Sequence, residues 1–239
     1  MERLSSYEDG DVLQNVYRML QYPTFFFAHV SVGVFVILVY VWMGYYNRES
    51  DKYSGFDWDD VNKVFNYHPV FMSVGFGFCT TQAILSFGWP LSSHGVKKVM
   101  HVVWHTMAWI FAAVGLKAVW KFHNENGITN LYSTHSWTGI FTIILYGIQY
   151  LMGLSYMLPT NILSIKARTI MMPFHRFIGG FAFAFAVCTM AMGIVEKMAF
   201  NGTGGNLGSE FRITAACICA LWAWALSVSA YLMIRHSRK

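Results

Sequence analysis

The sequence predicts an all-α polytopic membrane protein of six transmembrane helices, with no separate soluble domain. Of its 239 residues, 55% are hydrophobic and only 12% are charged, which is about half the charged share of an average soluble domain. The apolar residues form six blocks, each long enough for the ~20 residues that cross a ~30 Å hydrocarbon core as a helix. These blocks are residues 24–46, 66–88, 100–120, 133–158, 172–198 and 212–234. Such a chain is built for contact with membrane lipid, and its composition argues against a soluble enzyme or a nucleic-acid-binding domain.

Prolines support these helix limits. Pro23, Pro69, Pro90, Pro159 and Pro173 all lie near a predicted helix end, where the missing N–H of proline costs little. Four acidic residues precede the first apolar block, whereas a signal peptide begins with a basic region, so we expect a retained N-terminal tail. We predict one domain over residues 1–239, with a four-helix core at about 66–198 and peripheral helices at 24–46 and 212–234.

Basic residues are unevenly divided between the two sides of the predicted bundle. With six spans, both termini share a side with the connectors 89–99 and 159–171. By the positive-inside rule the excess of cations on that side predicts cytoplasmic termini. We expect the protein in the plasma membrane or in an endomembrane vesicle, with the glycosylation sequon at Asn201 on the non-cytoplasmic side. The side of the termini carries Arg3, Arg18, Lys97, Lys98, Lys166, Arg168, Arg235, Arg238 and Lys239, against six cations opposite.

Histidines are the ionisable residues that stand out inside the predicted helices. Ionisable groups at membrane depth are costly and indicate function. His68, His101, His135 and His175 lie near the beginnings of the second to fifth helices. Because neighbouring helices run antiparallel, His68 and His135 share one membrane side, and His101 and His175 share the other. The pattern predicts two imidazole pairs at two depths, although spacing leaves open whether His101 or His105, one turn later, joins the second pair.

Haem iron with two axial histidines suits such pairs. Bis-histidine ligation leaves no open iron position, which is typical of electron transfer. A catalytic zinc usually has three protein ligands, and the predicted helices contain almost no carboxylate besides Glu196. Small residues after the histidines (Gly75, Ala108, Gly139 and Gly179) would leave room for a macrocycle or serve ordinary helix packing. The alternatives are a haem-binding scaffold or sensor without turnover and a metal-ion transporter with histidine ligands.

Five stretches resemble the cytochrome b-561 family of di-haem transmembrane reductases. They are FNYHPVFMSVGF (65–76), KKVMHVVWHTMAWI (97–110), KFHNENGITNLYSTHSW (121–137), ARTIMMPFHRFIGG (167–180) and GIVEK (193–197). The resemblance implies two haem b groups and a homodimer. It selects His101 over His105 and implies that His68 pairs with His135, and His101 with His175, as axial iron ligands.

The resemblance also implies substrates. Ascorbate would donate electrons on the cytoplasmic side, and monodehydroascorbate or a ferric chelate would accept them on the other. Basic groups near the inner haem would attract the ascorbate anion, and a histidine suits the coupled transfer of a proton. The implied catalytic residues are His123, Lys97, Lys98 and Arg168, and the implied substrate-binding residues are Phe122, His123, Asn124, Tyr132, Lys97, Lys98 and Arg168.

The end of the second predicted helix departs from the family pattern. The family usually has a basic residue there, whereas AILSFGWPLSS (83–93) has none and the next cation is Lys97. By this resemblance a cation near the inner haem is missing, unless Lys97 or Arg176 replaces it.

Overall fold

The computed structural model describes residues 2–47, 51–90, 92–200 and 209–237, with the side chains of these except residues 2–11, 13, 18, 209, 236 and 237. In this described part, six helical segments are long and apolar enough to cross a membrane, and all the regular elements are helical. The predicted all-α polytopic fold is thereby confirmed. The sequon at Asn201 and the cations Arg238 and Lys239 lie outside the described residues.

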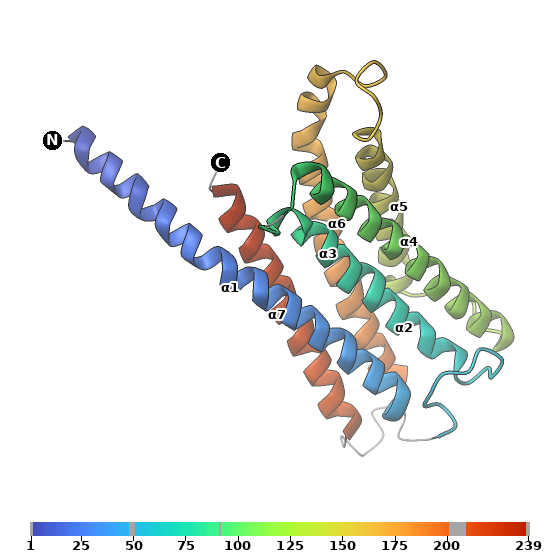
Figure 1. The fold of residues 1–239 in the computed structure, drawn as a ribbon. Helices are drawn as coiled ribbons and strands as arrows, with labels where there is room; N and C mark the ends of the chain where they lie inside the picture. The colour runs from blue at the N-terminus through green and yellow to red at the C-terminus, as the bar shows by residue number, and fades with distance from the viewer. Residues whose placement is uncertain (1, 48–50, 91, 201–208, 238–239) are drawn as a thin grey trace.

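Six spans follow one another along the chain. Figure 1 shows α1 and α7 side by side along one flank of the bundle, with both termini at the end that also holds the α3–α4 and α5–α6 connectors. We call this end the terminal side, and the opposite end, with connectors 46–63 and 126–133, the far side. The elements are α1 (Glu2–Tyr45), η2 (Val64–Asn66), α2 (Tyr67–Met72), η3 (Ser73–Cys79), α3 (Thr80–Leu85), η4 (Ser86–Gly88), α4 (His94–Glu125), α5 (Thr134–Ser155), α6 (Ile165–Phe200) and α7 (Ser209–Ser237).

Two prolines lie inside helices rather than at their ends. Helix α1 contains Pro23 and α6 contains Pro173, so the predicted beginnings at residues 24 and 172 are wrong. A proline costs one backbone hydrogen bond, and nearby hydroxyls can satisfy freed carbonyls in an apolar helix. Beside Pro23, Thr24 Oγ1 lies 2.8 Å from the carbonyl oxygen of Leu20 and 3.1 Å from that of Gln21. The predicted N-terminal tail is therefore a helical extension of the first span.

The second span changes its helical type halfway. Residues Ser73–Cys79 form a π-helix, a rare element that is often found at functional sites. A Cβ atom on Gly75 would lie 2.9 Å from the carbonyl oxygen of Ala108, so this span and α4 pack backbone against backbone. Gly75 and Ala108 were considered either as space for a macrocycle or as helix-packing residues, and the structure shows them in helix packing.

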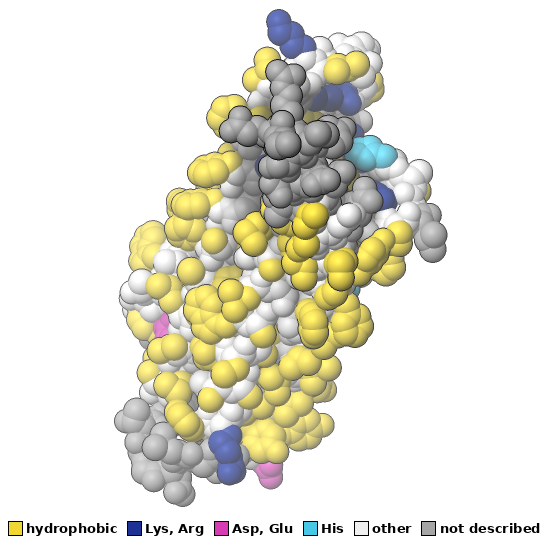
Figure 2. Space-filling view, turned by 90° about the vertical axis from the view of Figure 1, so that its left-hand side faces the viewer, with side chains coloured by type: hydrophobic (Ala, Val, Ile, Leu, Met, Phe, Trp, Pro, Cys, Tyr) yellow, Lys and Arg dark blue, Asp and Glu magenta, His cyan; other side chains and the backbone are white. Residues whose placement is uncertain are grey.

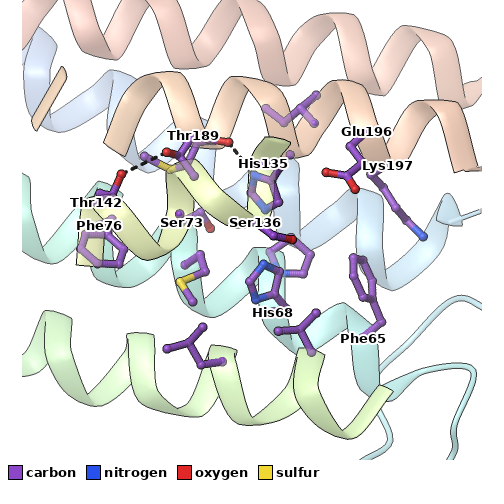
Figure 3. A pocket seen from close by; sticks show the side chains of 18 of the residues that line it. Phe65, His68, Ser73, Phe76, His135, Ser136, Thr142, Thr189, Glu196 and Lys197 are labelled. Carbon is purple, nitrogen blue, oxygen red and sulfur yellow. Dashed lines mark hydrogen bonds between the residues drawn. The ribbon is translucent and has the colours of Figure 1, made fainter. Parts of the chain in front are cut away.

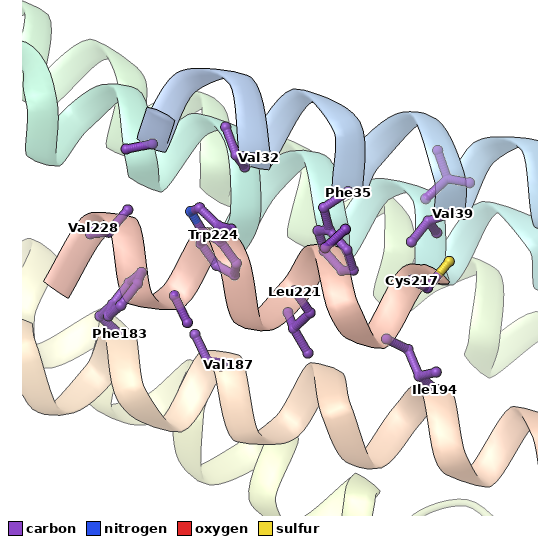
Figure 4. Packing of buried hydrophobic residues seen from close by; sticks show 14 of the residues in the cluster. Val32, Phe35, Val39, Phe183, Val187, Ile194, Cys217, Leu221, Trp224 and Val228 are labelled. Carbon is purple, nitrogen blue, oxygen red and sulfur yellow. The ribbon is translucent and has the colours of Figure 1, made fainter. Parts of the chain in front are cut away.

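The peripheral helices pack on the core through large apolar side chains. Trp224 of α7 stacks on Phe35 of α1 at 6.0 Å between ring centroids and meets Phe183 of α6 edge-on at 5.3 Å (Figure 4). Its indole N–H donates to Thr81 Oγ1 over 2.7 Å, which ties α7 to the second span. The outer face of α1 and α7 shows a broad apolar belt between charged ends (Figure 2), as expected for a lipid-facing surface.

Candidate functional site

The four predicted histidines form two facing pairs. His68 of α2 and His135 of α5 lie with ring centroids 6.1 Å apart, and Figure 3 shows both rings in the same pocket. His101 of α4 and His175 of α6 lie 6.3 Å apart. We call these the far-side pair and the terminal-side pair, since each lies toward that end of the bundle. The antiparallel order of the helices thus brings together the residues that the sequence analysis grouped.

Backbone carbonyls orient three of the four rings. His68 Nδ1 donates to the carbonyl oxygen of Gly115 at 3.1 Å, and His135 Nδ1 donates to that of Thr189 at 3.0 Å. In the other pair, His101 Nδ1 donates to Ala83 at 2.7 Å. A carbonyl oxygen can only accept, so the proton is on Nδ1 and the Nε2 lone pair is available to a metal. Metal-bound histidines are usually oriented by such a bond.

His175 is held by a side chain instead. Gln149 of α5 lies with its amide nitrogen 2.9 Å from His175 Nδ1, and the same amide donates to the His175 carbonyl oxygen. A Cβ on Gly179 would lie 2.8 Å from this amide nitrogen. Gly179 therefore leaves room for Gln149, and Gln149 in turn fixes the position of His175.

The spacing of both pairs fits an iron between them. With metal–nitrogen bonds of about 2 Å and about 1 Å more from each nitrogen to its ring centroid, two axial imidazoles need about 6 Å between centroids. The far-side pair lines a cavity of about 170 Å³, and the terminal-side pair a smaller one of about 30 Å³. A Cβ on Gly193 would lie 2.8 Å from His135 Cε1, so a glycine is needed beside this ring. The ring spacing in both pairs therefore suits two imidazoles that share one iron.

No larger cluster of metal-ligating side chains stands beside these pairs in the described part of the chain. There, no group of three or more His, Cys, Asp or Glu side chains lies together in a way that could hold a metal ion. The two facing imidazole pairs are therefore the arrangement on which the functional argument depends.

His105 lies beside the terminal-side pair and has a different partner. Its Nδ1 is 2.5 Å from the hydroxyl of Tyr146, a buried residue of α5. The Tyr146 hydroxyl also lies 3.3 Å from Thr80 Oγ1, in the second span. His105 is thus part of a polar contact between helices at the middle of the bundle.

Of the predicted far-side substrate residues, His123 and Tyr132 line the mouth of the larger cavity, and Phe122 and Asn124 are the neighbours of His123 in the chain. His123 Nδ1 lies 3.2 Å from Asn130 Oδ1, and the Asn130 amide donates to Asn124 Oδ1 at 2.9 Å. Tyr132 packs its ring 6.0 Å from that of His123. Phe122 lies beside His123 and contacts Phe65. The short 126–133 connector brings these side chains together at the end of α4.

Two residues at this mouth had no role in the sequence analysis. Asn130 links His123 to Asn124, and Glu196 of α6 accepts hydrogen bonds from Tyr132 at 3.3 Å and Ser133 at 3.1 Å. Burial of the Tyr132 hydroxyl and the nearby Glu196 charge raise the pKa of Tyr132 to about 12. Tyr132 is therefore a hydrogen-bond donor at physiological pH. In the sequence Glu196 was visible as an isolated carboxylate inside an apolar block and as part of the GIVEK stretch, but it had no assigned partner.

The predicted cytoplasmic cations lie on the terminal side, in the first turns of two helices. Lys97 and Lys98 belong to α4, and Arg168 belongs to α6. Lys98 Nζ donates to the carbonyl oxygen of Tyr156, and Arg168 donates to those of Leu158 and Leu163. Lys98 and Arg168 therefore hold the α5–α6 connector in place, a structural role that was not predicted from the sequence.

Comparison with known proteins agrees with this architecture. The family model described as eukaryotic cytochrome b561 matches residues 67–201. The chain is 35% identical over 214 residues to a probable ascorbate-specific transmembrane electron transporter of Oryza sativa subsp. japonica, covering 87% of this chain and 89% of the relative. It is 36% identical over 190 residues to transmembrane ascorbate ferrireductase 1 of Arabidopsis thaliana, covering 77% and 76%.

An animal relative shows the same extent of similarity. A lysosomal membrane ascorbate-dependent ferrireductase of Bos taurus is 36% identical over 222 residues, covering 89% of this chain and 80% of the relative. The matched region contains all four paired histidines. With its six spans and its family-model match over more than half of the sequence, the chain belongs to the cytochrome b561 family.

Proposed function

We propose that this protein is a transmembrane ascorbate-dependent reductase that binds two haem b groups. It takes electrons from ascorbate on the terminal side, which we assign to the cytoplasm, and delivers them to monodehydroascorbate or a ferric chelate on the far side. The observation that carries the proposal is the presence of two histidine pairs at two depths, each with the spacing of a bis-imidazole iron site. The ascorbate-linked functions of the similar proteins named above support the choice of ascorbate.

In this proposal His68 and His135 would hold one haem, and His101 and His175 would hold the other. A bound haem would provide a one-electron iron couple, and two histidine ligands would leave no position for oxygen. The hydrogen bonds to Gly115, Thr189 and Ala83 orient three of the rings and leave their Nε2 atoms free to hold a metal. The helices thereby fix the two redox centres at separate depths.

The far-side residues bind the acceptor and exchange a proton with it. Monodehydroascorbate becomes ascorbate by gaining one electron and one proton, so a proton donor must be near. His123 holds a proton at Nδ1 against Asn130 and exchanges another at Nε2. Tyr132 donates to Glu196 and so stays in place beside His123. Phe122 and Asn124 complete the binding surface.

The terminal-side cations attract the electron donor. Ascorbate is a monoanion at neutral pH, and Lys97, Lys98 and Arg168 make the entrance to the terminal-side pair positive. Lys98 and Arg168 also fix the α5–α6 connector, so the entrance keeps its shape. We further propose that residues 1–239 act as one domain in the lipid bilayer, that the protein is a homodimer, and that it resides in the plasma membrane or an endomembrane vesicle.

A visible spectrum of the purified full-length protein before and after addition of ascorbate tests this function. We expect about two b-type haems per chain, both reduced by ascorbate. Reduction by dithionite alone would retain the haem sites and overturn ascorbate as the donor. A preparation without haem, even after expression with added haemin, would overturn the whole proposal.

A further inference from the structure

Arg235 lies near the terminal-side pair although it belongs to the last helix. Its guanidinium carbon is 5.5 Å from the centroid of the Phe87 ring. The Phe87 ring is in turn 5.2 Å from that of His101. The last predicted helix, expected only to pack at the periphery, therefore brings a cation to this site.

The end of the second span is shaped to receive α7. A Cβ on Gly88 would overlap the hydroxyl oxygen of Tyr231 and would lie 2.9 Å from Phe25 Cε2. Tyr231 is fully buried, and its hydroxyl accepts a hydrogen bond of 3.0 Å from Arg235 Nη1. No side chain fits at position 88 while Tyr231 occupies this space. Tyr231, which leaves room only for glycine at position 88, also holds Arg235 in place.

The guanidinium retains donors for a ligand. Arginine has five N–H donors, and Tyr231 accepts from one of its nitrogens. Neither of the ion pairs Lys63–Asp60 and Lys121–Glu125 involves Arg235. Arg235 lies over the ring of Phe87 and donates to the hydroxyl of Tyr231. A cation with such neighbours suits an anionic oxygen ligand.

We infer that Arg235 is an anion-binding residue of the terminal-side site and takes a carboxylate or enolate oxygen. The inference rests on the proposed function. Two sources share this chemistry, namely a carboxylate of the haem held by His101 and His175, and the ascorbate anion itself. In either case α7 brings to this site a positive charge that the end of the second span lacks.

The test compares Arg235→Gln with Arg212→Gln in the full-length protein. Arg212 is an exposed cation at the opposite end of the same helix, so its variant loses the same charge away from the site. Three quantities are measured: the rate of haem reduction by ascorbate, the rate with an uncharged quinol, and the midpoint potentials of both haems in an equilibrium titration. Haem content per chain shows that each variant has folded.

The outcomes separate the two sources. If the ligand is ascorbate, R235Q slows reduction by ascorbate about tenfold or more, the loss expected for one charge-assisted hydrogen bond, and leaves the quinol rate and the potentials unchanged. If the ligand is the haem carboxylate, R235Q lowers the potential of one haem because a positive charge has been removed. In both cases R212Q resembles the wild type, and Arg235→Lys falls between.

A result in which R235Q equals R212Q in all three measurements would overturn the inference. If R235Q loses haem, the variant Tyr231→Phe replaces it in the test. This variant keeps the charge of Arg235 but removes the hydroxyl that holds it, and the same three quantities are measured. If they equal those of R212Q, the inference is overturned. A wild-type protein without haem would be a failure of the proposed function, which the spectrum reveals before any variant is made.

Discussion

His101 and His105 lie one turn apart on α4 with ring centroids 4.4 Å apart, yet their Nδ1 atoms bond to different groups. His101 donates to the carbonyl of Ala83, whereas His105 meets the hydroxyl of Tyr146. A carbonyl fixes the proton on Nδ1 and frees Nε2 for iron, but a hydroxyl can donate or accept and fixes neither.

We predict that His101→Ala lowers haem content from two to one per chain, while His105→Ala retains two. Measurement of haem per chain in both purified variants decides this point. If instead the His105→Ala protein bound one haem and the His101→Ala protein bound two, His105 rather than His101 would be the ligand.

Gly193 tests the space around the far-side pair. A Cβ there would lie 2.8 Å from His135 Cε1 and 3.2 Å from His135 Nδ1, and overpacking of this kind costs about 1–3 kcal/mol. Gly193→Ala should therefore reduce haem occupancy at the far-side pair. Gly180→Ala, in the same helix with nothing within 4 Å of the added carbon, should keep full occupancy. Equal haem content in the two variants would refute this reading of the site.

Asn66 tests the fold just before the far-side pair. Its buried amide donates to the carbonyls of Tyr53 at 2.7 Å and Gly55 at 2.8 Å, and its oxygen accepts from Asn47 at 2.7 Å. Removing such a partner leaves buried groups unsatisfied, at about 1–3 kcal/mol each. We expect Asn66→Ala to lower the unfolding temperature clearly. Asn62→Ala, which loses a bond to Asp60 in the partly buried connector, should have a small effect, and similar losses in the two variants would contradict the prediction.

Ionisation of Tyr132 gives a prediction on pH. Its pKa is raised from 10.0 to about 12 by burial of the hydroxyl and by the charge of Glu196. The Tyr132 phenol therefore ionises at a lower pH in the unfolded chain than in the folded protein. Its contribution to stability is complete below about pH 10 and is lost between about pH 10 and 12. Ultraviolet difference titration of the wild type against Tyr132→Phe should show this phenol ionising late. Glu196→Gln should move the transition toward 10, and a wild-type transition at 10 would exclude the Glu196 contact.

Hydropathy and histidine spacing together predict most of the core. Six apolar blocks correspond to the six spans because each must satisfy its backbone hydrogen bonds within the bilayer. Antiparallel order alone places His68 with His135 and His101 with His175 on two sides, and the geometry agrees. Hydropathy and histidine spacing are informative here because a membrane leaves few ways to arrange the chain.

Side chains that act between distant segments could not be predicted in this way. Periodicity gives no information on which helix lies beside α7, so the approach of Arg235 to Phe87 had no signal in the sequence. The Asn66 network depends on the path of the 47–63 connector. The beginning of α1 was missed because a proline normally ends a helix, whereas an apolar span tolerates it.

The two histidine pairs lie at opposite ends of an apolar bundle, and this separation gives the proposed reaction an electrical direction. An electron that passes from the terminal-side pair to the far-side pair carries charge through part of the bilayer. A membrane potential of 100 mV does about 2.3 kcal/mol of work on a charge that crosses completely. A membrane that is negative on the terminal side therefore drives the electron toward the far side, so that in sealed vesicles an imposed voltage would change the rate at fixed substrate concentrations.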